Sequence, residues 1–96
     1  MPTYERTPEF LGDLRRLTPA QRQLFETAVK AMVEDLRAVR PFRSSLRIER
    51  FHRRPGAYEM TWAPDGRALF TYGPSIRLNE PHIVWLAVGT HRIYTR

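Results

Sequence analysis

The side chains in this chain that could carry out chemistry are its arginines, histidines and tyrosines. The sequence has three histidines and no cysteine, and the spacing of His52, His82 and His91 fits no standard metal-ligand set. It contains neither a glycine-rich phosphate loop nor a Gly-x-Ser-x-Gly nucleophile turn. We therefore expect no metal site, no cofactor and no serine-dependent hydrolysis.

One reaction needs only such side chains, namely cleavage of RNA by its own 2′-hydroxyl group. It requires a base that removes the hydroxyl proton, a cation near the charge of the phosphorane, and an acid that protonates the leaving 5′-oxygen. Histidine serves as base or acid near neutral pH, and arginine stabilises the phosphorane. Tyrosine stacks on an exposed base or donates a proton.

The distribution of charge favours a polyanionic partner. The formal net charge is +6. Residues 1–39 contain equal numbers of acidic and basic residues, whereas residues 40–96 carry ten arginines against four acidic residues. All basic residues except Lys30 are arginine, which fits either a GC-rich genome or recognition of phosphate by guanidinium groups.

Several basic residues are candidates for contacting that partner. Strand alternation would place Arg47 on the face opposite Leu46 and Ile48. The cations that follow it belong to a loop, where a solvated turn explains His52 equally well. The full set of predicted RNA-binding residues is Arg47, Arg50, His52, Arg53, Arg54 and Arg92.

Two helix-start signals precede this basic half. Thr7 followed by Pro8 predicts a helix over residues 8–17. Thr18, Pro19 and Gln21 form a predicted capping box that begins a second helix, over residues 19–38. The inward face of the second helix includes Leu24, Phe25 and Met32.

After Pro41 the apolar pattern becomes alternating, which indicates strands. We expect strands near residues 46–51, 58–62, 67–72 and 82–88, with a tight turn over residues 63–66 and a break at Gly89-Thr90. Trp85 lies in the predicted core. The predicted fold class is α+β, with an N-terminal helix hairpin packed on a roughly four-stranded antiparallel sheet. We expect residues 1–96 to form a single domain.

Three segments carry a resemblance to a known family. They are residues 62–73, residues 81–85 and the sequence Gly89-Thr90-His91. Together with residues 13–21, they resemble the RelE/ParE toxin superfamily, and more narrowly a RelE-like branch whose last strand ends in a Gly-Thr-His motif. The resemblance covers nearly the whole chain and implies the same helix hairpin and sheet.

The resemblance also implies site residues. Relatives with nuclease activity place an arginine on the strand after the hairpin turn, which corresponds to Arg67. Near the end of the last strand they carry a histidine, or a basic residue with a tyrosine, which corresponds to His91 and Tyr94. The expected catalytic residues are therefore His91, Arg67 and Tyr94. Arg92 stands where relatives usually have aspartate, so an acidic partner that could orient the histidine is missing from that position.

The implied function is that of the toxin of a type II toxin–antitoxin system. Such a toxin would act as a ribosome-associated mRNA endoribonuclease that inhibits translation by metal-independent attack of the 2′-hydroxyl. Its expected partners are a cognate antitoxin protein, mRNA and the ribosome. We expect a cytoplasmic protein without membrane contact, because the first ten residues are polar and the longest apolar run, residues 83–88, is too short to cross a bilayer.

Two alternatives remain open at the level of sequence. A ParE-like poison of DNA gyrase would share the scaffold and perform no nuclease chemistry. A degenerate, non-toxic RNA-binding module is the second alternative, and Arg92 is its only hint. The nuclease interpretation requires that His91 and Arg67 lie together on the open side of the sheet.

Overall fold

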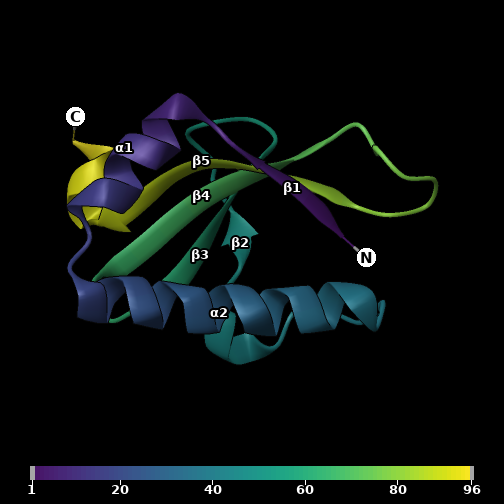
Figure 1. The fold of residues 1–96 in the computed structure, drawn as a ribbon, viewed down its shortest axis with the longest axis horizontal. Coiled ribbons are helices and arrows are strands. Elements are labelled where there is room, and N and C mark those ends of the chain that lie inside the picture. Colours follow the sequence, from purple (N-terminus) through teal and green to yellow (C-terminus); the bar gives the residue numbers. More distant parts are fainter. Residues whose placement is uncertain (1, 96) are drawn as a thin grey trace.

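The fold consists of two helices and a five-stranded sheet, and both helices follow the first strand in the chain. The computed structural model describes residues 2–95 (Figure 1). Its elements are β1 (Thr3–Arg6), α1 (Pro8–Arg16), α2 (Pro19–Arg37), the 3-10 helix η1 (Ser44–Leu46), β2 (Glu49–Arg50), β3 (Ala57–Ala63), β4 (Gly66–Gly73), β5 (His82–Thr90) and the 3-10 helix η2 (His91–Tyr94).

The sheet is mixed rather than antiparallel. Its order is β1-β5-β4-β3-β2, and β1 runs parallel to β5 while the other neighbours are antiparallel. The α+β class and the helix hairpin on a sheet are confirmed, but the prediction of four antiparallel strands omitted β1. This edge strand has four residues, three of them exposed, so it shows no apolar alternation that a sequence pattern could reveal.

Both predicted helix starts are confirmed. The Thr7 hydroxyl accepts a hydrogen bond from the backbone N–H of Phe10 at 3.2 Å. Thr18 and Gln21 form the reciprocal capping box, with distances of 3.1 and 2.9 Å. The helices end within one residue of the predicted positions, at Arg16 and Arg37.

The two helices cover the same face of the sheet through an aromatic core. Phe10 of α1 and Phe25 of α2 both pack against Trp85 of β5, with ring centroids 5.7 and 5.4 Å apart. Phe25 also meets Trp62 edge-on at 6.2 Å. Met32 is buried as predicted, whereas Leu24 is 51% exposed and lies outside this core. Leu24 directly precedes Phe25, and the side chain of Phe25 points toward the sheet, so the helical rotation turns Leu24 outward.

The segment after α2 differs from the predicted strand over residues 46–51. Leu46 is buried in the core, but it belongs to η1, and only Glu49 and Arg50 form β2. Arg47 has a left-handed backbone with φ of 45°, which interrupts an extended run. The argument that strand alternation orients Arg47 is therefore wrong.

A buried aspartate fixes this segment against α2. The Asp35 carboxylate accepts hydrogen bonds from Arg40 Nε at 2.7 Å, Arg43 Nε at 3.1 Å and the backbone N–H of Arg43 at 2.9 Å. The bonds from Arg43 hold the pKa of Asp35 well below its usual range, with a smaller contribution from Arg40. The alternating pattern was overridden here by an ion-pair network that the sequence does not display.

The end of β5 continues past the predicted break. Gly66 pairs with Thr90 and Arg67 pairs with Gly89, so β5 reaches the tip of the β3–β4 hairpin. At that tip Gly66 lies against the Trp62 ring, where an added Cβ would come within 2.5 Å of a ring carbon. Trp62 Nε1 donates to the Arg67 carbonyl at 2.9 Å. The strand therefore delivers the residue after Thr90 beside the hairpin turn.

His82 is a buried residue that connects two strands. It is 3% exposed, and its ring nitrogens lie 2.8 Å from Thr3 Oγ1 and 2.9 Å from Glu5 Oε1. These contacts join β5 to β1, in agreement with its interpretation as a residue at the beginning of a strand. Within residues 2–95, neither helix has the length and apolar character required to cross a membrane.

Candidate active site

The sheet face opposite the helices carries the candidate site. Glu59, Thr61 and Arg67 alternate away from the core, and Thr61 pairs directly with Arg67. The helix η2 follows β5 and places Tyr94 on the same face, where its hydroxyl donates a hydrogen bond to Glu59. Strand alternation and the turn after Thr90 therefore bring residues from β3, β4 and η2 together.

His91 contacts the tip of the β3–β4 hairpin. Its Nδ1 is hydrogen-bonded to the carboxylate of Asp65, and the two side chains are 54% and 66% exposed. The bond to His91 lowers the pKa of Asp65, and the charge of Arg67 adds to the effect. Asp65 is therefore an ionised acceptor, so Nδ1 carries the proton that the bond requires. Within residues 2–95, Nε2 has no protein partner and can accept a proton from a ligand.

Arg67 is anchored at the same turn. Its Nη1 donates to the carbonyl groups of Ala63 and Pro64, both at 3.2 Å, and of Gly66 at 2.9 Å. Its charge acts on both Asp65 and Tyr94, because it lowers the pKa of each. Among residues 2–95 all three bonds of the Arg67 side chain use Nη1, so its Nη2 and Nε donors have no partner there and remain available for a ligand.

Tyr94 is held by its ring and by its hydroxyl. The ring stacks on Phe51 with centroids 5.1 Å apart, and the guanidinium carbon of Arg53 lies 5.3 Å from the Tyr94 centroid. Burial and the bond to Glu59 raise the pKa of Tyr94 well above its usual value. The His91 ring meets that of Tyr94 edge-on at 6.1 Å. We call the group of His91, Asp65, Arg67, Tyr94 and Arg53 the hairpin-end site.

The other predicted RNA-binding residues lie outside this group. Arg50 and His52 line a pocket of about 350 Å³ formed by the loop that precedes β3 and by the first residues of that strand. Arg54 is exposed on that loop, and Arg47 is exposed at the end of η1. In the described part of the chain, residues 2–95, no hydrogen bond, ion pair or ring contact links these four residues to His91 or Arg67. Their assignment to RNA binding stays a prediction.

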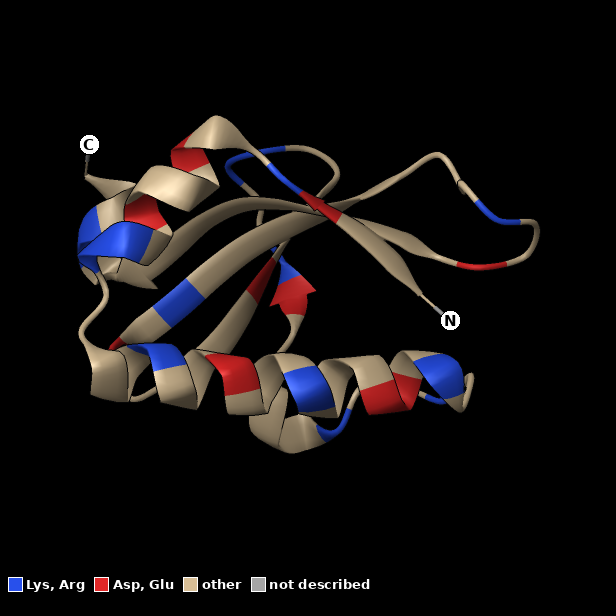
Figure 2. Ribbon diagram, in the orientation of Figure 1, with Lys and Arg blue, Asp and Glu red and all other residues tan. Residues whose placement is uncertain are grey.

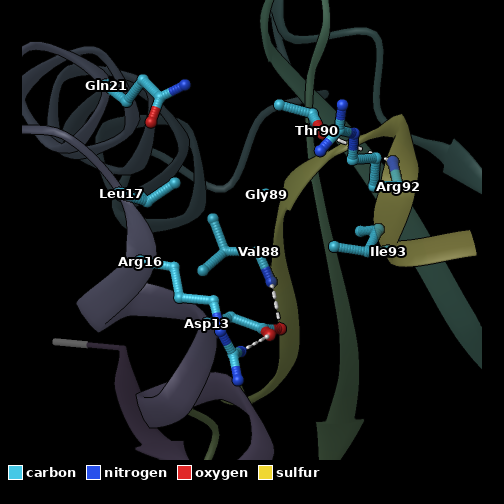
Figure 3. A pocket seen from close by; sticks show the side chains of 9 residues that line it. All are labelled: Asp13, Arg16, Leu17, Gln21, Val88, Gly89, Thr90, Arg92 and Ile93. Carbon is cyan, nitrogen blue, oxygen red and sulfur yellow. Dashed lines mark hydrogen bonds and ion pairs between the residues drawn. The ribbon is translucent and has the colours of Figure 1, made fainter. Parts of the chain in front are cut away.

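Arg92 lies on a different side of η2 from the hairpin-end site. It lines a pocket between β5 and the connection from α1 to α2, together with Arg16 and Gln21 (Figure 3). His91 and Arg92 are consecutive, yet their side chains serve separate surfaces.

Sequence reasoning missed two acidic members of this surface, Asp65 and Glu59. Asp65 was assigned to the turn because Pro64-Asp65-Gly66 is a turn sequence, and that signal hid its second role. Glu59 lies in the strand predicted over residues 58–62, and the sequence pattern assigns it no role of its own. Their partners lie 26 and 35 residues away, and no local pattern reports such pairs. Within residues 2–95, no cluster of three or more His, Asp or Glu side chains could hold a metal ion.

The fold is that of known bacterial toxins. No protein family matches the sequence, and no curated protein matches it either. Among solved structures, the DinJ–YafQ complex of Escherichia coli matches with a TM-score of 0.67 at 11% identity, over 97% of each chain. The YoeB/ParE toxin from Agrobacterium tumefaciens gives 0.64 at 12% identity, over 93% of this chain and 98% of the toxin.

A third match is the toxin–antitoxin complex RelBE2 from Mycobacterium tuberculosis. Its TM-score is 0.54 at 23% identity, over 95% of this chain and 100% of the matched chain. At these identities the likeness establishes the fold. The RelE/ParE-like fold that the sequence resemblance implied is confirmed.

Proposed function

We propose that this chain is a single toxin domain of a toxin–antitoxin pair that cleaves messenger RNA on the ribosome without a metal ion. The observation that carries this proposal is the hydrogen bond between His91 and Asp65, next to the anchored guanidinium of Arg67. A base, its orienting carboxylate and a phosphate-binding cation then occupy one exposed surface. The similar folds of toxins solved with their antitoxins support the same role.

In the proposed reaction, His91 acts as the general base. Asp65 holds the proton on Nδ1, so Nε2 removes the proton of the 2′-hydroxyl group. The 2′-oxygen forms a bond to phosphorus while the bond to the 5′-oxygen breaks, which leaves a 2′,3′-cyclic phosphate and a 5′-hydroxyl group. Arg67 lies beside the developing negative charge and stabilises it.

The leaving 5′-oxygen takes its proton from water in this scheme. Tyr94 is a poor proton donor to the leaving group, because its hydroxyl already donates a hydrogen bond to Glu59 and its pKa is raised. Tyr94 instead positions the reactants, since its ring, Phe51 and Arg53 form a stack beside His91. Such a stack suits contact with a base or a phosphate group.

The departure at Arg92 does not deprive His91 of an acidic partner. Relatives in the resembled branch place aspartate directly after the histidine, whereas here Asp65 comes from the hairpin turn. We therefore favour an active nuclease over a degenerate module. Arg47, Arg50, His52 and Arg54 extend the cationic surface for mRNA or ribosomal RNA, and a cognate antitoxin would cover the hairpin-end site.

The test is expression of the chain without an antitoxin, followed by mapping of transcript ends. Wild type should arrest growth and cut transcripts inside translated frames. His91→Ala and Arg67→Ala should abolish both effects, while Arg77→Ala, an exposed cation on the loop between β4 and β5, should abolish neither. Intact transcripts with altered DNA supercoiling would support a gyrase poison, and absence of growth arrest would support the degenerate module.

A further inference from the structure

A second concave surface lies on the other side of η2. It is a pocket of about 490 Å³ between the α1–α2 connection and the end of β5. In Figure 3 side chains of both elements line it, with the guanidinium of Arg16 beside Asp13 at one end and Arg92 beside Thr90 at the other. Figure 2 shows basic positions of α1 and η2 at this same end of the molecule. Leu17 and Val88 supply apolar wall, and Gln21, Thr90, Arg16 and Arg92 supply polar groups. We call this space the α-corner pocket.

The open part of this pocket is cationic. Arg16 is 77% exposed and forms an ion pair with Asp13 at 3.4 Å. Asp13 is only 3% exposed and also accepts the backbone N–H of Val88 at 3.1 Å. The acidic group therefore lies in the wall, where it orients Arg16, and the guanidinium extends toward solvent. Arg92 adds a second exposed cation.

The pocket adjoins the hairpin-end site through the backbone of η2. His91 and Arg92 are consecutive, so their Cα atoms are about 3.8 Å apart. The Thr90 hydroxyl accepts the Arg92 N–H at 3.4 Å, which fixes the start of η2. A single strand that crosses η2 would thus contact His91 on one side and Arg92 on the other.

We propose that the α-corner pocket binds the nucleotide next to the scissile phosphate, with one backbone phosphate against Arg92 and the next one against Arg16. This inference rests on the proposed nuclease function. The base of that nucleotide packs on the apolar wall beside Leu17, and the guanidinium groups pair with phosphate oxygens. It also gives a reason for arginine at position 92, since an aspartate there would repel the phosphate.

The experiment is direct binding of a single-stranded RNA whose 2′-oxygens are methylated, so that it cannot be cleaved. Fluorescence anisotropy is measured on the full chain at several salt concentrations. Arg16→Ala and Arg92→Ala should each weaken binding by roughly 3- to 10-fold and lower the slope of log K against log salt by about 0.7, the value for one phosphate contact in a single strand. Arg15→Ala removes the same charge from the adjacent position of α1, outside the pocket, and should change neither quantity.

The outcomes separate this inference from the proposed function. If Arg16→Ala and Arg92→Ala bind like Arg15→Ala while transcripts are still cut, the pocket assignment fails and the nuclease proposal stands. If the two variants keep their affinity for RNA and lose affinity for the antitoxin, the pocket binds the antitoxin instead of a nucleotide, and the assignment fails. Failure of the wild type both to bind the oligonucleotide and to cut transcripts would overturn both proposals.

Discussion

Asp65, at the tip of the β3–β4 hairpin, accepts a hydrogen bond from Nδ1 of His91, which lies 26 residues further along the chain. This pair joins a turn to the helix that follows β5. It leaves Nε2 exposed on the surface where Arg67 is anchored. In a proposed nuclease, that relationship separates the roles of the two groups, because the carboxylate orients and the imidazole reacts.

Removal of either partner should have a different effect on cleavage. His91→Ala should lower the single-turnover cleavage rate by about 10²–10⁴-fold, the usual contribution of a general base. Asp65→Asn should cause a smaller loss, since the base remains but its tautomer is no longer fixed. Both side chains are exposed, so circular dichroism should show an unchanged fold. Equal rates for Asp65→Asn and wild type would contradict the orienting role.

The same pair can be tested by carboxyl titration. The pKa of Asp65 is lowered from 3.8, first by its bond to His91 and then by smaller effects that include the charge of Arg67. In ¹³C NMR titration, Asp65 of the wild type should lose its proton below the ordinary range. In His91→Ala the midpoint should rise toward that range. An identical midpoint in both proteins would show that the two side chains do not interact in solution.

Tyr94 should matter for its ring more than for its acidity. Tyr94→Phe keeps the stack on Phe51 and loses only the bond to Glu59, so it should preserve cleavage and reduce stability by about 0.5–1.5 kcal/mol. Tyr94→Ala should reduce both. Because burial and Glu59 raise the pKa of Tyr94 and burial also raises that of Tyr72, ultraviolet titration should detect two late phenols, of which Glu59→Gln should shift only that of Tyr94 to lower pH. A large loss of cleavage in Tyr94→Phe would instead indicate that the Tyr94 hydroxyl donates a proton in the reaction.

Lysine should not replace Arg67. One guanidinium nitrogen of Arg67 bonds three carbonyl groups and leaves further donors for phosphate, whereas lysine offers one compact ammonium group. We expect Arg67→Lys to lose most of the cleavage activity, nearly as much as Arg67→Ala. Arg77→Lys is the matched control. Full activity of Arg67→Lys would mean that only its charge is used.

Asp35 should make the fold sensitive to acid. Its folded pKa is depressed by Arg43 and Arg40, so its stabilisation is fully present above the unfolded value of about 3.9 and is lost as pH falls toward the lower folded value. Wild type should therefore lose more thermal stability than Asp35→Asn on acidification below about pH 4. Glu34→Gln, at a 65% exposed neighbour that also pairs with Arg43, should behave like wild type.

The parts of the fold that the sequence predicted are those with local signals. Thr7, Thr18 and Gln21 mark helix starts within three residues, and Pro64-Asp65-Gly66 marks its turn in the same way. The missed parts depend on distant partners. β1 forms because it pairs with β5, and η1 replaces a strand because Asp35 binds Arg43 from the preceding helix.

The residues of the candidate site also fall into those that the sequence indicated and those that depend on distant partners. A family resemblance was sufficient to select His91, Arg67 and Tyr94, and the structure brings these three onto one surface. It was insufficient to find Asp65 and Glu59, since each is an ordinary acidic residue until its partner is placed. The sequence also could not show that Arg92 and His91 face different surfaces, because adjacent residues of a tight turn can point to different sides.

The parallel pairing of β1 with β5 has a consequence for the order of folding. Thr3 and His82 are 79 residues apart, so closing this pair requires a long loop, whereas α2 needs only neighbouring residues. We therefore expect β1 to dock on β5 late, whereas β4 and β5 are joined by residues 74–81 alone, so they pair early and carry η2 to the hairpin tip. The proposed site would then assemble, with His91 at Asp65 beside Arg67, before the N-terminal edge strand takes its place in the sheet.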